Sequence, residues 1–289
     1  MRISVSITNF SWPVASRALA GKVAAVARAA EDAGVHTVWV ADHLFQADPA
    51  SSPDEPMLEA YTTLGYLAGQ TRRVRLGTLV TAAAFRAPAL LAKQVATLDV
   101  LSGGRAWLGL GAGYNEQEAA AMGVPLPPVV QRFEILAETI DIVRRMWADD
   151  QSPYQGRHHR LAGPIGRPLP IEPPRLLIGG TGERRTLRLV AEHADACNLF
   201  DLPDGGAAVR RQLDVLARHC SDVGRPFDDI ERTITTALRP DESIDEFVHR
   251  AGELAGLGIE HVVVITRGTP WTDDKLATIA GAVPQLAAA

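Results

Sequence analysis

The sequence predicts an α/β protein built as a closed (β/α)8 TIM barrel. Short apolar runs alternate strictly with helix-favouring stretches, and the chain of 289 residues holds eight such pairs. Strict alternation indicates a parallel sheet with right-handed crossovers. Eight pairs in this length fit a closed barrel better than an open sheet, so we expect residues 1–289 to form a single domain.

The strands are expected where apolar and β-branched residues run together between polar or glycine-rich stretches. Leu176, Leu177 and Ile178 form such a continuous run, which is typical of a parallel strand covered on both faces. The eight predicted strands are Ile3–Ile7, Thr37–Ala41, Val74–Thr81, Arg105–Gly111, Arg175–Ile178, Asp195–Leu199, Thr233–Ala237 and His261–Ile265.

The helices are expected between these strands, and several carry end signals. Gly34 is a C-cap for the first, and Pro88 suits the first turn of the third. The fifth has apolar residues at i, i+3, i+4 and i+7 from Leu187. The eight predicted helices are Leu19–Ala33, Met57–Thr71, Pro88–Leu101, Phe133–Trp147, Leu187–Ala194, Ala207–Val223, Ile244–Leu257 and one from Asp273 beyond Ile279.

The segment Asp150–Pro174 interrupts this rhythm after strand four. It carries six prolines, together with glycine and histidine. Because a strand resumes at Arg175, we expect an insertion, residues 150–174, that crosses the top of the barrel. Long loops of this kind commonly act as lids or binding loops.

Composition excludes several classes of partner. The net charge is 29 − 34 = −5, without a basic stripe, which argues against nucleic acid and anionic membranes. The two cysteines, Cys197 and Cys220, make no disulfide framework and suit a reducing compartment. The N-terminus reads as a strand and not as a signal peptide, and no apolar run is long enough to span a bilayer. We therefore expect a cytoplasmic protein.

The turn after the fifth strand is the main candidate binding element. Gly179, Gly180 and Gly182 let bare backbone approach a ligand, and the helix that follows starts with unpaired N–H groups. The helix dipole favours an anion there, so this turn is a candidate phosphate site. A tight strand-to-helix turn without a ligand explains the same residues equally well.

Other candidate residues end the second, third and fourth strands, where barrel chemistry is located. Asp42 and His43 pair a carboxylate with an imidazole and suit proton transfer; a cap or a structural hydrogen bond is the alternative. Gly111 and Gly113 let a flat ligand approach, or serve as bulge and loop glycines. The spacing G-x-G-x-G is not the dinucleotide fingerprint.

Several chemistries find no support. No metal site is predicted, because His158 and His159 are adjacent in a loop without cysteine or carboxylate at ligand spacing. No G-x-S-x-G elbow or Cys–His arrangement is readable, which argues against covalent hydrolysis. A barrel isomerase or aldolase acting on a phosphorylated substrate requires a lysine or glutamate at a strand end, and none is predicted there.

The motifs together resemble the luciferase-like monooxygenase superfamily, in particular its oxidoreductases that depend on the deazaflavin coenzyme F420. The likeness covers nearly the whole chain up to about Ala237. Members that use flavin mononucleotide (FMN) share the motifs. The matching stretches are residues 40–43, 57–61, 75–81, 92–94, 98–105, 108–116, 132–133 and 178–187.

The resemblance implies where a cofactor lies. The tricyclic ring would occupy the barrel mouth, with a non-proline cis peptide expected at Leu79–Val80 behind it. His43 matches a histidine that some deazaflavin dehydrogenases use as acid or base. Tyr114 stands where the family often has tryptophan. The implied cofactor wall is Asp42, Leu79, Val80, Gly111, Ala112, Gly113 and Asn115, and the implied phosphate turn is Gly179, Gly180, Thr181 and Gly182.

The function expected from this resemblance is hydride transfer between F420 and a small organic substrate. An alternative is an FMN-dependent monooxygenase that takes reduced flavin from a separate reductase and activates oxygen. A third hypothesis, of another class, is a non-catalytic protein that binds a flavin or deazaflavin. The resemblance also predicts a homodimer.

Overall fold

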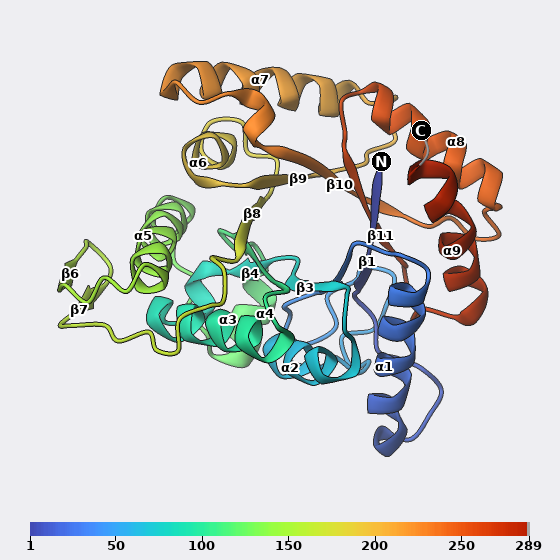
Figure 1. The fold of residues 1–289 in the computed structure, drawn as a ribbon, viewed down its shortest axis with the longest axis horizontal. Coiled ribbons are helices and arrows are strands. Elements are labelled where there is room, and N and C mark those ends of the chain that lie inside the picture. Colours follow the sequence, from blue (N-terminus) through green and yellow to red (C-terminus); the bar gives the residue numbers. More distant parts are fainter. Residues whose placement is uncertain (288–289) are drawn as a thin grey trace.

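A computed structural model describes residues 1–287, and its centre is a closed ring of eight parallel strands surrounded by helices (Figure 1). The bounds of most predicted strands agree with those of the observed strands to within a residue or two. The ring consists of β1 (Arg2–Ile7), β2 (Thr37–Val40), β3 (Arg75–Thr78), β5 (Ala106–Gly111), β8 (Arg175–Gly179), β9 (Ala196–Phe200), β10 (Glu231–Ala237) and β11 (His261–Ile265).

Strand pairing proves that the ring closes. β3 pairs with β2 on one side and with β5 on the other, with Leu76 opposite Ala106. β1 likewise joins the two ends of the chain, since Ile3 lies opposite Val262 of β11. No barrel strand is left with an open edge, and the predicted TIM barrel is confirmed.

The helices pack around the outside of the ring in chain order (Figure 1). α8 begins with a capping box between Ser243 and Glu246, while α3 has Pro88 in its first turn and ends at left-handed Gly103. The helices are α1 (Ser16–Asp32), α2 (Ala60–Gln70), α3 (Pro88–Ser102), α4 (Glu116–Met122), α5 (Val129–Trp147), α6 (Thr186–His193), α7 (Ala207–Val223), α8 (Ile244–Gly256) and α9 (Asp273–Ala287).

Three details of the predicted elements are wrong. The expected helix Met57–Thr71 starts only at Ala60, because the Glu59 side chain accepts the N–H groups of Tyr61 and Thr62 and so caps it. The expected strand Val74–Thr81 is interrupted, and its last part forms the separate strand β4 (Thr81–Ala82). α4 was not predicted, because seven residues carry too little periodicity to be recognised.

The segment 150–174 does not cross the top of the barrel as expected, and none of its residues lines the cavity at the barrel mouth. It runs outside the ring and forms a small antiparallel hairpin of β6 (Tyr154–Gln155) and β7 (Arg160–Leu161). Its two histidines are held by carboxylates of α5. His158 Nε2 lies 2.7 Å from Glu134 Oε2, and His159 Nδ1 lies 3.0 Å from Glu138 Oε2. They therefore attach the insertion to α5.

Side chains fill the interior of the ring below its mouth. Trp39 and Trp107 meet edge to face, with ring centroids 5.5 Å apart, and Leu177, Ala196 and Val263 complete this inner cluster. A separate, larger core fills the space between the strands and the helices. The interior of the barrel is therefore packed, as in other TIM barrels, where ligands bind at the C-terminal ends of the strands.

The N-terminal ends of the strands carry a buried ionic network. His261 Nδ1 lies 2.7 Å from Glu231 Oε1, and His261 Nε2 lies 2.5 Å from Ser4 Oγ. The His261 hydrogen bond and nearby arginines outweigh burial and lower the pKa of Glu231 to about 2. His36 meets the ring of His261 edge to face, and burial followed by the charge of that neighbour lowers the pKa of His36 to about 4.

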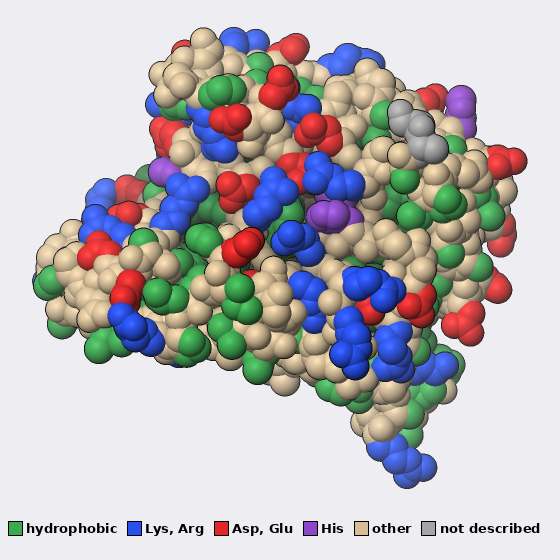
Figure 2. Space-filling model, in the orientation of Figure 1, with side chains coloured by type: hydrophobic (Ala, Val, Ile, Leu, Met, Phe, Trp, Pro, Cys, Tyr) green, Lys and Arg blue, Asp and Glu red, His purple; other side chains and the backbone are tan. Residues whose placement is uncertain are grey.

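Figure 2 shows that Lys and Arg side chains alternate with Asp and Glu over the face in view. No large single-sign field covers that face. None of the described helices meets the length and hydropathy needed to cross a membrane.

Candidate functional site

A cavity of about 350 Å³ opens at the C-terminal ends of the barrel strands. Every one of the eight barrel strands, or the loop that follows it, contributes to its wall. All the predicted site residues line it except Thr181 and Gly182. The predicted residues found there are Asp42, His43, Leu79, Val80, Gly111, Ala112, Gly113, Asn115, Gly179 and Gly180.

The predicted phosphate turn is therefore split between the cavity wall and its rim. Gly180 adopts φ of +124°, which favours glycine. A Cβ on Gly182 would lie 2.8 Å from Oγ1 of Thr186, so the turn folds closely over the first residue of α6. No side chain caps α6, and its first turn carries no acidic residue. The Leu187 N–H already donates to the Gly182 carbonyl at 3.1 Å, whereas the N–H of Thr186 has no such partner among the described residues and can receive an anion.

Three glycines form a cup around the side chain of Val80. A Cβ on Gly109, Gly111 or Gly179 would lie 3.1, 2.9 or 2.9 Å, respectively, from a Val80 methyl group. Gly109 is also pressed against the backbone, since its Cβ would lie 2.0 Å from the carbonyl oxygen of Thr78. Gly109 and Gly111 thus serve the bulge at Val80, while Gly111 still lines the cavity.

The bulge itself is the non-proline cis peptide Leu79–Val80, which confirms that expectation. Leu79 and Val80 rest on the inner cluster of the barrel and face the cavity above it. They therefore form an apolar floor at the mouth.

Asp42 is buried, and three hydrogen bonds hold its carboxylate. Arg86 binds it in a bidentate manner, with Nη1 to Oδ2 at 2.5 Å and Nη2 to Oδ1 at 2.8 Å. Thr81 Oγ1 donates to Oδ2 at 2.6 Å. A bidentate guanidinium pair fixes both partners, so Asp42 shapes the cavity wall and is not free to move protons.

Arg86 also holds the neighbouring elements together. It donates to Glu59 at 2.9 Å and lies 4.9 Å above the ring of Tyr61. Burial opposes its charge, but Asp42 outweighs burial and raises the pKa of Arg86. Burial, followed by the charge of Asp42, raises the pKa of Tyr61. This network was not predicted, because its members come from four separate segments.

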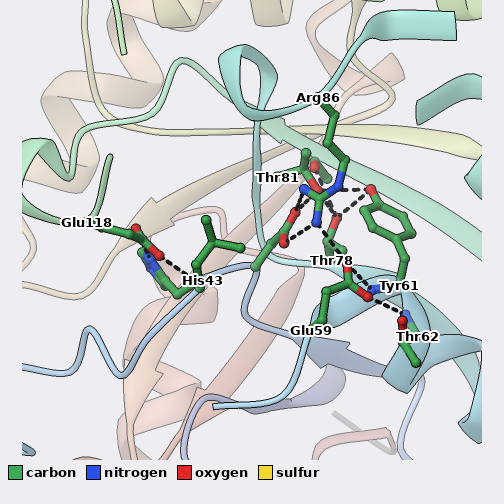
Figure 3. A network of polar contacts seen from close by, with 11 residues as sticks. His43, Glu59, Tyr61, Thr62, Thr78, Thr81, Arg86 and Glu118 are labelled. Atoms are coloured by element: carbon green, nitrogen blue, oxygen red, sulfur yellow. Dashed lines mark hydrogen bonds and ion pairs between the residues drawn. The ribbon is translucent and has the colours of Figure 1, made fainter. Parts of the chain in front are cut away.

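Glu118 holds His43 through a hydrogen bond to its imidazole ring, as Figure 3 shows. Nδ1 of His43 lies 2.8 Å from Oε2 of Glu118, and the residue Glu118 is completely buried. The phenol oxygen of Tyr114 lies 3.5 Å from Nε2 of His43. The ring therefore presents Nε2 to the cavity, which fits the acid or base expected from its sequence position.

Glu118 was not singled out from the sequence, since it lies in α4 and not at a strand end. The helix that carries it was not foreseen, although Asn115 followed three residues later by glutamate is a recognisable helix-start pattern. The Asn115 side chain accepts the Glu118 N–H at 3.0 Å and so caps α4. Asn115 thus has a structural role beside its place in the cavity wall.

Polar residues that the sequence did not single out complete the wall. Ser6 lies there, and its buried hydroxyl has no protein partner among the described residues. Asp48 and Arg267 stand at the edge, with Oδ1 and Nη1 3.6 Å apart. No cluster of three or more metal-ligating side chains occurs within residues 1–287.

A closed barrel with a cavity at the C-terminal strand ends is the arrangement of TIM-barrel enzymes. The family model described as luciferase-like monooxygenase matches residues 1–277. The chain therefore belongs to the luciferase-like monooxygenase family.

Curated relatives carry F420 in their names. The F420-dependent glucose-6-phosphate dehydrogenase of Kineococcus radiotolerans is 36% identical over 165 residues, which are 56% of this chain and 48% of that protein. The enzyme of the same name from Microbacterium testaceum is 30% identical over 205 residues, covering 70% of this chain and 59% of that one. The chain thus spans less than two thirds of the length of these relatives.

Solved structures confirm the fold. An F420-dependent secondary alcohol dehydrogenase in complex with an F420–acetone adduct superposes with a TM-score of 0.84 at 16% identity, covering 99% of this chain and 98% of that one. EDTA monooxygenase from Chelativorans sp. superposes with a TM-score of 0.79 at 15% identity, covering 100% and 94%.

Proposed function

We propose that this protein is an oxidoreductase that transfers a hydride between coenzyme F420 and a small organic substrate. The observation that carries the proposal is the cavity at the barrel mouth, which combines an apolar floor with one histidine presenting Nε2. Its size lies within the range of small-molecule sites.

The residues present fit a planar ring. The unpaired hydroxyl of Ser6 needs a partner, and a polar ring edge can supply one. Leu79 and Val80 offer an apolar surface to a ring face. Gly113, with φ of +80°, keeps the opposite loop free of a side chain.

The anionic tail of the cofactor would lie at the turn Gly180–Gly182. The start of α6 has no side-chain cap, so the N–H of Thr186 and the helix dipole favour a phosphate. Glu183 follows this turn and is paired with Arg211, and Arg184 and Arg185 come next, so that positive charges predominate near the turn.

When bound, F420 supplies two-electron hydride chemistry. The chain supports that chemistry in three ways. Leu79 and Val80 buttress one face of the ring, the closed barrel keeps water from below, and His43 exchanges the accompanying proton at Nε2. Asp42, clamped by Arg86, keeps the wall rigid.

The choice of F420 over FMN rests on the names of the relatives at 30% identity and above. Titration of the purified protein with each cofactor separately, followed by the fluorescence change of the cofactor, tests it. F420 should bind more tightly than FMN. Tighter binding of FMN would favour the monooxygenase that works with a separate reductase.

Replacement of His43 by alanine separates an enzyme from a non-catalytic binding protein. We expect F420 affinity to hold, while turnover of a candidate substrate such as glucose 6-phosphate or a secondary alcohol falls about 100-fold or more. Unchanged turnover in this variant would remove His43 from the mechanism. Tight F420 binding without turnover of any candidate by the wild type would support the non-catalytic alternative.

A further inference from the structure

Glu118 occupies an unusual place for a carboxylate. The residue is fully buried, yet it comes from the exposed two-turn helix α4. Its backbone is fixed by the Asn115 cap, and both carboxylate oxygens have partners. Oε1 accepts the N–H of Leu44 at 2.5 Å, and Oε2 faces Nδ1 of His43 at 2.8 Å.

The other two carboxylates in the cavity wall are paired with arginines. Asp42 is clamped by Arg86, and Asp48 pairs with Arg267. Glu118 alone in that wall takes an imidazole as its ionic partner. A buried carboxylate left without a partner would be strongly unfavourable, so Glu118 and His43 depend on each other.

The hydrogen bond to Glu118 indicates which ring nitrogen of His43 carries the proton. An ionised carboxylate only accepts, so Nδ1 of His43 must carry a proton. The neutral ring then has a free lone pair at Nε2, on the cavity side. The Tyr114 hydroxyl at 3.5 Å is too distant to occupy that lone pair strongly.

We propose that Glu118 is a positioning residue that holds His43 in the Nδ1–H tautomer with Nε2 aimed into the cavity. This rests on the proposed function for its purpose and on the contacts of Glu118 for its geometry. With F420 bound to supply the hydride chemistry, Nε2 of His43 would take up the proton that an oxidised substrate loses together with its hydride, and Glu118 would face the resulting imidazolium. In the reductive direction, Nε2 would return the proton to the substrate.

The variant Glu118→Gln gives a sharp test. The N–H of Leu44 can only donate, so the amide oxygen of glutamine must face it. The NH₂ group then faces Nδ1 of His43, which must accept. The proton moves to Nε2, and the ring changes from the Nδ1–H to the Nε2–H tautomer.

The tautomer is read from the imidazole ¹⁵N resonances of the cofactor-free protein at alkaline pH, with His43 assigned by loss of its signals in His43→Ala. We expect mainly Nδ1–H in the wild type and mainly Nε2–H in Glu118→Gln. Turnover of the loaded Glu118→Gln enzyme should fall about 100-fold with little change in KM.

Glu116→Gln is the matched control. It makes the same chemical change on the same helix, at a side chain that is 79% exposed and paired with Arg132. It should leave the His43 tautomer unchanged. A Glu118→Gln spectrum identical to the wild type would overturn the proposal, as would a wild-type ring that is mainly Nε2–H. The wild-type measurement decides even where the variant folds poorly.

The measurement without cofactor separates this inference from the proposed function. If F420 fails to bind but the tautomer changes as expected, the proposed function fails and the positioning role stands. If F420 binds and the tautomer does not change, the positioning role fails and the proposed function stands.

Discussion

Gly179→Ala tests the close packing between β8 and the bulge at Val80. Gly179 ends β8, and its φ is one that alanine adopts without strain. The new Cβ would lie 2.9 Å from Cγ1 and 3.3 Å from Cγ2 of Val80. The cost of the substitution therefore comes from this contact and not from the backbone.

The expected magnitude follows from that contact. Overpacking of a well-filled site typically costs about 1–3 kcal/mol, because neither strand can move freely in a closed barrel. Val80→Ala alone removes two methyl groups and costs about 1.5 kcal/mol in lost burial. In the double variant the clash disappears, so the total loss should be smaller than the sum by about 1 kcal/mol or more.

Urea unfolding followed by tryptophan fluorescence measures the four free energies of this cycle. Gly252→Ala in α8 is the control, because its Cβ would meet nothing within 4 Å. It should be neutral or stabilise the protein by up to about 1 kcal/mol. Losses from Gly179→Ala and Val80→Ala that add to within about 0.5 kcal/mol would refute the glycine cup as the reason for these glycines.

Three further substitutions test other parts of the structure. Asp42→Ala leaves the Arg86 guanidinium without its main partner and should lower the free energy of unfolding, measured in urea, by about 3–5 kcal/mol. A decrease below about 1 kcal/mol would contradict the clamp. Ser6→Ala should weaken F420 binding about 2–10-fold in a fluorescence titration, and equal affinity would show that the hydroxyl makes no contact. The folded-state pKa of His36, about 4, lies below the unfolded value. The contribution of neutral His36 to folding stability is therefore complete above pH 6.5 and is lost as the pH falls to about 4. His36→Gln should therefore flatten the fall of Tm between pH 6.5 and 4, and an unaltered slope would show that another group causes it.

Much of the architecture could be predicted because each strand carries its own signal. The buried runs around Val38, Leu177 and Val263 are apolar whatever their neighbours, and glycine or proline marks many element ends. Alternation then leaves few topologies. The cavity residues followed from their position at strand ends and from the family resemblance.

The errors arose where long-range contacts override local pattern. Val74–Thr81 reads as one strand, but the structure breaks it at Leu79–Val80 and seats Val80 among glycines from two other strands. The role of Gly109 and Gly111 could not be decided from their spacing, because a bulge and the close approach of a ligand both require glycine.

The sequence by itself determined the barrel, because periodicity and turn residues are local properties, and its motifs indicated, through their resemblance to a known family, the residues that would surround a ligand. Only the tertiary structure decided their roles. It showed that Asp42 is clamped by Arg86, while Nε2 of His43 has the Tyr114 hydroxyl 3.5 Å away, and that Glu118 reaches His43 across 75 positions of the chain. Hydrogen-bond partners depend on which segments the closed ring brings together, and no local pattern encodes that.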